Sequence, residues 1–163
     1  MRNNMETAAG RLGRVVAIRM APGVDLLEGL QEACEQYGIK NGVILSAIGS
    51  LNGVVFCNPV EMPIKAGYGY GEDQRLTGPI ELTSATGVIC HDDEGAVNLH
   101  VHVTLTDRHG GAHGGHLRPG SRVLLNLDAV IAEIDGVEMA RKLDEELGVP
   151  RLSPRQEQYG NDR

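Results

Sequence analysis

Five of the chain's six histidines lie in one stretch, NLHVHVTLTDRHGGAHGGHL, which covers residues 98–117. Alternate residues of a β-strand point to the same face, so His100 and His102 project together, about 6 to 7 Å apart. At nitrogen-to-metal distances of about 2.0 to 2.1 Å, both imidazoles can reach one zinc ion. The pair therefore predicts two ligands of a metal site.

A third imidazole is expected from the chain reversal after this strand. DRHGG predicts a turn, and AHGGHL after it predicts an antiparallel return. This return brings His113 or His116 back to the first pair. We favour His116, which begins the exit from the turn, over His113 and His109, which we place in the turn itself. The two glycines before His116 leave room for a ligand and allow unusual backbone conformations.

Three neutral imidazoles suit zinc, iron, nickel or copper, and we expect zinc first. A fourth coordination position then remains for water or for a small polar or anionic molecule. Catalytic zinc proteins use such a position to generate hydroxide or to polarise a carbonyl. Asp107, Asp128 and Glu133 are the candidate catalytic carboxylates, as an additional ligand, a partner of a ligand or a general base. The sequence places none of them and identifies no reaction, so it does not decide whether the protein is an enzyme.

Other roles for these histidines stay open. Two histidines at alternate positions on a polar strand face are often solvated, or they form hydrogen bonds at an interface. The same residues are also suited to a subunit contact that responds to protonation. The return through GGH favours the metal site over these alternatives.

The elements that must position the histidines are mainly strands. Residues 97–105 alternate strictly, with aliphatic side chains on the face opposite His100 and His102. The sequence predicts further strands at residues 14–20, at 80–89, at 122–134, and as two short runs within 42–57 that are separated by a turn.

A helix is predicted after Asp25, which caps it with Glu28 three residues later, and Gly38 ends it. Helical periodicity also predicts a second helix between Gly136 and Gly148. Residues 58–79 are rich in glycine and proline, which favours an ordinary surface loop. The alternative is a mobile flap over a site, because two tyrosines flank glycines there.

Composition limits the class of protein. The 163 residues carry a formal net charge of −7 and no basic run, which argues against a protein that grips nucleic acid phosphates. The three cysteines, Cys34, Cys57 and Cys90, are far apart and odd in number, so we expect no disulfide framework and a reducing, cytoplasmic location. The chain has no apolar run of about 18 residues and no apolar leader, so we expect no membrane segment.

The domain organisation is expected to be simple, because this length suits one domain better than two. We expect a flexible N-terminal arm over residues 1–13, one domain over residues 14–152, and a flexible C-terminal tail over residues 153–163.

The order of the motifs resembles one known family. RMAPGVDLLEGLQEACEQYGIKNGVILSAIGSLNGVVF is followed by GPIELTSATGVI, the histidine stretch, VLLNLDAVIAEI and MARKLDEELG. Together these segments are similar to the plants and prokaryotes conserved (PPC) domain, also called DUF296, in its free-standing prokaryotic form. The resemblance implies an α+β fold with a twisted, mainly antiparallel sheet packed with one or two helices, assembled as a homotrimer. It also implies an extended course after Gly136, against the helical periodicity.

The resemblance has consequences for function. It implies that His100, His102 and His116 bind a metal, and four further residues match family positions: Arg19, Glu81, Arg141 and Asp144. Plant relatives join the domain to AT-hooks, and prokaryotic ones are named DNA-binding by analogy. This chain lacks an AT-hook, which removes the known grip on the minor groove. It also has Asp128 where bacterial relatives often carry Glu.

Three functions follow from the sequence. We favour a homotrimeric protein with a three-histidine metal site open to a small molecule. The first alternative is a DNA-associated regulator or scaffold, for which direct DNA contact is disfavoured but not excluded. The second is a purely structural trimer module.

Overall fold

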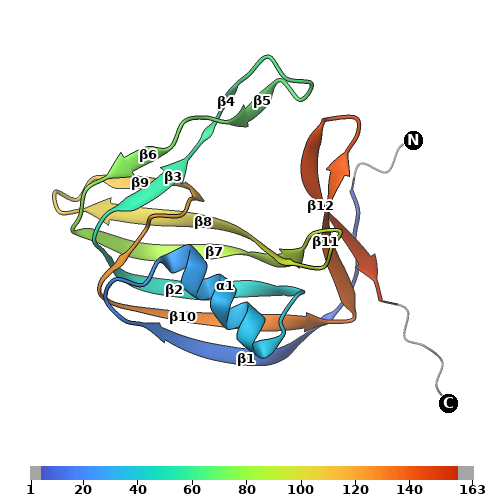
Figure 1. Cartoon of the computed structure of the whole chain (residues 1–163), viewed down its shortest axis with the longest axis horizontal. Coiled ribbons are helices and arrows are strands. Elements are labelled where there is room, and N and C mark those ends of the chain that lie inside the picture. The colour runs from blue at the N-terminus through green and yellow to red at the C-terminus, as the bar shows by residue number, and fades with distance from the viewer. Residues whose placement is uncertain (1–4, 158–163) are drawn as a thin grey trace.

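A computed structural model describes residues 5–157. Within this range the chain forms one helix and twelve strands (Figure 1). In chain order these are β1 (Arg11–Met20), α1 (Leu26–Tyr37), β2 (Gly42–Leu51), β3 (Val54–Cys57), β4 (Pro59–Glu61), β5 (Tyr68–Tyr70), β6 (Gln74–Leu76), β7 (Ile80–His91), β8 (Val97–Asp107), β9 (Ala112–Leu117), β10 (Val123–Asp135), β11 (Val137–Asp144) and β12 (Val149–Gln156).

Most strands belong to one curved sheet, in the order β1-β10-β2-β7-β8-β9-β3-β6. All neighbours along this path are antiparallel. Helix α1 packs against β8 and also against β1, although these strands are far apart in the sheet order. The sheet therefore curls around the helix, as Figure 1 shows. The arrangement confirms the expected α+β class with a mainly antiparallel sheet. Residues 5–157 contain one helix.

Local chemistry explains the helix. The carboxylate of Asp25 accepts hydrogen bonds from the backbone N–H groups of Leu27 and Glu28, at 3.0 and 3.3 Å. These bonds satisfy amides that have no partner inside the helix. The other oxygen of Asp25 accepts from Gly120 N at 2.7 Å, which ties the helix start to the segment before β10. Gly38 ends the helix with a φ of 65°, a conformation that costs glycine little.

The core lies between α1 and the concave face of the sheet. Along β8 the predicted alternation is confirmed: Val101, Val103 and Leu105 are buried, whereas His102 and Thr104 are exposed. Each fully buried aliphatic side chain contributes about 1.5 to 3 kcal/mol of transfer free energy. The core therefore holds β8 rigidly and leaves its outer face free to carry polar groups.

The second predicted helix is wrong. Residues 137–144 form β11, which turns back as β12, and this hairpin stands off the main sheet (Figure 1). Val137 and Met139 point to the same side of the strand and pack with Cys90 of β7 in a small apolar cluster. The extended course implied by the family resemblance is correct.

The predicted domain boundaries also change at the C-terminal end. β12 continues through Gln156, so residues 153–156 belong to a paired strand and not to a tail. At the other end β1 begins at Arg11, within the predicted arm. The outermost parts of the arm and the tail, residues 1–4 and 158–163, lie outside the described residues.

Residues 58–79 are more ordered than a surface loop. β4 and β5 form a separate two-stranded sheet, and β6 pairs with β3 at the end of the main sheet. All three cysteines are free and buried. Among the described residues, no helix has the length and apolar character needed to cross a membrane.

Candidate metal centre

Three histidines converge on the outer face of the sheet. His102 of β8 lies directly opposite His116 of β9 in the antiparallel register, and His100 lies two residues earlier on β8. Because directly paired residues point to the same face, all three imidazoles share one side of the sheet. The predicted return strand is thus present, and it brings His116 to the pair.

The three rings form a nearly equilateral triangle. Their centroids lie 5.0 Å apart for His100 and His102, 5.1 Å for His100 and His116, and 5.4 Å for His102 and His116. One nitrogen from each ring lies within 4.8 Å of the other two. Among the described residues these three histidines form the cluster of potential ligands close enough to hold one ion.

The nitrogen spacing matches a coordination polyhedron. The Nε2 atoms of His100 and His102 are 3.1 Å apart. Two ligands bound tetrahedrally at about 2.05 Å lie about 3.3 Å apart, so small side-chain adjustments suffice for both to bind one zinc ion. His116 Nδ1 is buried and has no hydrogen-bond partner, which is costly for a polar atom.

The surroundings lower the pKa of two of the three rings, His100 and His116. Burial, together with the positive charges of the His100 and His102 imidazoles, lowers the pKa of His116 to about 4. Burial likewise lowers the pKa of His100, followed by the positive charge of Arg141. A neutral imidazole has the free lone pair that a metal needs, so protons compete little with a metal at neutral pH.

Tyr70 is the site residue that the sequence did not identify. Its ring stacks on His116, with centroids 4.3 Å apart and an interplanar angle of 28°. Its hydroxyl lies 3.3 Å from His100 Nε2 and 3.5 Å from His102 Nε2. Burial raises the pKa of Tyr70, so the phenol keeps its proton at neutral pH. The β4–β5 hairpin therefore covers one side of the cluster, as in the alternative of a segment over a site.

His113 lies on β9 and not in the expected turn, and it is apart from the cluster. His113 pairs with Leu105 on the core-facing side of the β8–β9 hairpin, and its Nε2 is 2.9 Å from Asp107 Oδ2. Asp107 also accepts hydrogen bonds from the backbone N–H groups of His109 and Gly111. Hydrogen bonds from His113 and these amides hold the pKa of Asp107 down at about 2. Asp107 thus stabilises the turn and does not face the three rings.

The other candidate carboxylates are also distant. Asp128 and Glu133 lie on β10, which β2 and β7 separate from β8. Three strand spacings correspond to about 14 Å. Glu133 forms an ion pair with Arg14, with its oxygens 2.8 and 3.1 Å from the guanidinium nitrogens. Asp128 is exposed and lies opposite Arg19 of β1.

The two glycines before His116 have a different role from the expected one. Neither has a positive φ. A Cβ on Gly114 would lie 2.5 Å from the carbonyl oxygen of Val103, and one on Gly115 would lie 2.7 Å from that of Cys57. These glycines therefore allow close packing of β9 against its neighbours, and the room they leave is taken by backbone.

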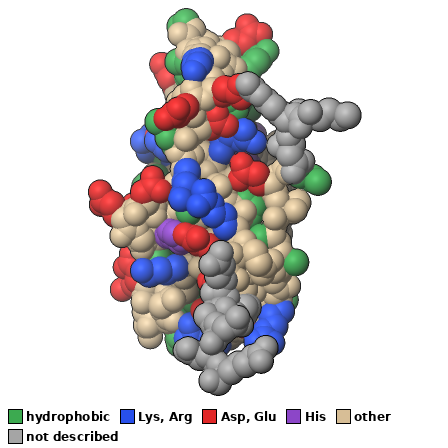
Figure 2. Space-filling view, turned by 90° about the vertical axis from the view of Figure 1, so that its right-hand side faces the viewer, with side chains coloured by type: hydrophobic (Ala, Val, Ile, Leu, Met, Phe, Trp, Pro, Cys, Tyr) green, Lys and Arg blue, Asp and Glu red, His purple; other side chains and the backbone are tan. Residues whose placement is uncertain are grey.

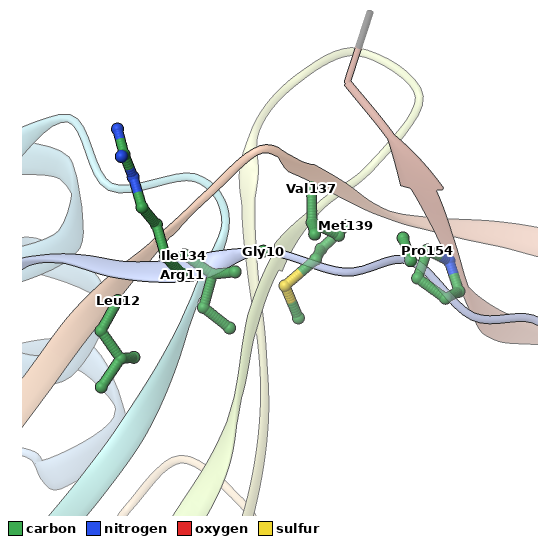
Figure 3. A pocket seen from close by; sticks show the side chains of 8 residues that line it. Gly10, Arg11, Leu12, Ile134, Val137, Met139 and Pro154 are labelled. Atoms are coloured by element: carbon green, nitrogen blue, oxygen red, sulfur yellow. The ribbon is translucent and has the colours of Figure 1, made fainter.

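Apart from the histidine cluster, a hollow of about 340 Å³ lies between the N-terminal segment and the β11–β12 hairpin. It is lined mainly by apolar side chains, among them Ile134, Val137 and Met139, while Arg11 points away from them (Figure 3). Because no group of polar atoms converges there, the histidine cluster remains the candidate site.

Fold and site together define a protein in which residues 5–157 form one helix and a curved, mainly antiparallel sheet with a three-histidine cluster on its outer face. Residues 7–135 match the model of the Plants and Prokaryotes Conserved domain, abbreviated PCC or PPC, and the chain belongs to this family.

Solved structures share this fold. A plant- and prokaryote-conserved protein from Pyrococcus horikoshii has 27% sequence identity and a TM-score of 0.74, and covers 90% of this chain and 97% of its own. A metal-containing protein from Archaeoglobus fulgidus has 26% identity and a TM-score of 0.76, and covers 91% of this chain and 99% of its own. A hypothetical protein from Salmonella has 25% identity and a TM-score of 0.77, with 91% and 97% covered.

A longer protein contains a similar segment. The bifunctional protein GlmU of a Synechococcus strain is 28% identical over 139 residues, which is 85% of this chain. The chain spans only 20% of that protein's length.

Proposed function

We propose that the protein binds one transition metal ion through His100, His102 and His116 and presents it to a small molecule. Zinc is the metal that we expect. The observation that carries this function is the convergence of three ligand nitrogens within 4.8 Å of one another. Burial lowers the pKa of His100 and His116, which favours the neutral form of these two rings. A relative from Archaeoglobus fulgidus that shares the fold is a metal-containing protein, which supports the same conclusion.

The residues present fit such an ion. Imidazole suits zinc, and the buried Nδ1 of His116 has no hydrogen-bond partner among the described residues. When bound, a zinc ion would supply Lewis acidity to a ligand oxygen. The protonated phenol of Tyr70 would donate a hydrogen bond beside it, and its ring holds the orientation of His116.

Elemental analysis of protein prepared without a histidine tag tests this function. About one equivalent of metal per chain is expected, together with an X-ray absorption spectrum that shows nitrogen ligands. His100→Ala should reduce the metal to background, whereas His109→Ala, in the turn, should leave it unchanged. Background metal in the unmodified protein, even after incubation with zinc, would refute the function.

We further propose that the protein assembles as the homotrimer implied by its family. Apolar side chains on adjacent strands β10 and β2 point away from the core, and Leu125 and Ile48 are 69% and 52% exposed. Such a face is typical of a subunit contact. Light scattering should give three times the chain mass, and Leu125→Glu should reduce it. If removal of His100 also dissociates the trimer and metal stays at background, the histidines serve assembly only.

Direct binding of DNA is not part of this function. The formal net charge is −7, and basic and acidic side chains are interspersed on the face shown in Figure 2. A protein that neutralises phosphates concentrates positive charge on one surface. A gel shift at low ionic strength should therefore retain no DNA, and salt-sensitive retention would restore the DNA-associated alternative.

A further inference from the structure

A hollow of about 320 Å³ opens beside the histidine cluster. His100 and Val88 form its sheet side, and Arg141, Pro150, Arg151 and Leu152 of the β11–β12 hairpin form the other side. Tyr70 reaches the same His100 from the β4–β5 hairpin. The cluster is thus flanked by two hairpins, and the hollow is the approach on the side of β11.

The two arginines of the hollow differ in how their charges are compensated. Arg151 is paired with Asp144, whose Oδ2 lies 2.7 Å from the guanidinium. The half-buried Arg141 donates one hydrogen bond, 3.3 Å long, to the carbonyl oxygen of Pro150. Among residues 5–157, Arg141 takes part in none of the ion pairs. Its guanidinium therefore keeps donors for a ligand.

The position of Arg141 is unusual for a cation. Arg141 and His100 line the same hollow, so the guanidinium lies beside the histidine cluster. A positive charge here is unfavourable beside a bound metal ion unless an anion lies between the two. The hollow lies between Arg141 and His100, and it is large enough for a molecule of a few non-hydrogen atoms.

We propose that Arg141 binds the carboxylate or phosphate group of a small anionic ligand in this hollow, where a second oxygen of that ligand faces the metal position. This assignment rests on the proposed metal function. A guanidinium presents parallel N–H donors that match both oxyanions, which a lysine cannot reproduce. Arg151, whose charge is paired with Asp144, lines the same hollow beside Arg141.

Calorimetric titration tests the assignment, with inorganic phosphate and malonate as separate probes on zinc-loaded protein freed of excess metal. Arg141→Met should weaken binding of the preferred anion about tenfold or more, since it removes a charge-assisted hydrogen bond. Arg141→Lys should fall between. Arg155→Met, which removes an equal charge from the exposed part of the same hairpin, should change affinity less than twofold. Comparison of the two probes shows whether the natural ligand is a carboxylate or a phosphate.

Metal content, measured on the same samples, separates the possible failures. It should be equal in the wild type and in Arg141→Met. If metal is bound but Arg141→Met binds both anions as tightly as the wild type, or Arg155→Met loses as much affinity, the anion assignment is wrong. If the wild type binds no metal, the metal function fails, and anion binding to the metal-free protein that depends on Arg141 would still support this subsite.

Discussion

Removal of a single imidazole should abolish the stabilisation of the fold by zinc. A ligand at 100 times its dissociation constant stabilises the folded state by about 2.7 kcal/mol. For 163 residues, an unfolding entropy of about 2.1 cal/mol/K per residue amounts to about 0.34 kcal/mol/K. Zinc should therefore raise the unfolding temperature by about 8 °C, and His116→Ala should show less than about 2 °C.

The strand itself provides a matched control. His113 lies three residues before His116 on β9 but on the opposite face, hydrogen-bonded to Asp107. His113→Gln should therefore keep the full zinc-dependent shift, even if its unfolding temperature without metal is lower. Scanning calorimetry or far-ultraviolet circular dichroism provides the measurement. A full shift in His116→Ala, or an equal loss in both variants, would show that the geometry does not hold the ion.

Three further outcomes are expected. Tyr70→Ala should weaken zinc binding about tenfold in competition with a chelator, because the ring that orients His116 is lost, while Tyr70→Phe keeps the stack and most of the affinity; equal affinities in all three proteins would exclude this support. Leu105→Ala should lower the free energy of unfolding in urea by about 2 to 5 kcal/mol, against less than about 0.5 kcal/mol for the exposed Leu143→Ala. The folded-state pKa of Asp107 is about 2, below its usual 3.8, so its contribution is present above pH 3.8 and is lost as the pH falls towards 2; Asp107→Asn should lose less thermal stability over that interval, and an identical pH profile would contradict this role.

The hairpin that carries the histidines could be predicted from local pattern. A period of two along residues 97–105 separates core from outer face, and the glycine-rich turn requires β9 to run back beside β8. These two facts place His100, His102 and His116 together. The sequence pattern does not show whether Gly114 leaves room for a ligand or allows two strands to pack closely, because this depends on the distance between Gly114 and the backbone of Val103.

The remaining parts of the site depend on contacts between distant segments. In residues 137–147 the apolar positions satisfy a helical period, and the strand is selected by pairing with β12 and by the packing of Met139 against Cys90 of β7. Tyr70 could be noticed from the alternation YGYG, but its place over His116 follows from how the β4–β5 hairpin leaves the sheet. The carboxylates were candidates by residue type alone, and the strand order separates Asp128 and Glu133 from the cluster.

The two hairpins that flank the histidines are attached differently from the strands that carry them. β8 belongs to the middle of the sheet and is anchored by the core, whereas β4–β5 forms a sheet of its own. β11 pairs with β7 through a single bridge between Ala140 and His91 and packs on it through a small apolar cluster. Changes in either hairpin can therefore alter the selectivity of the site without disturbing the donor atoms beneath it. A chain built in this way can acquire a new ligand through substitutions in the β4–β5 and β11–β12 hairpins while β8 and β9 keep the three histidines in place.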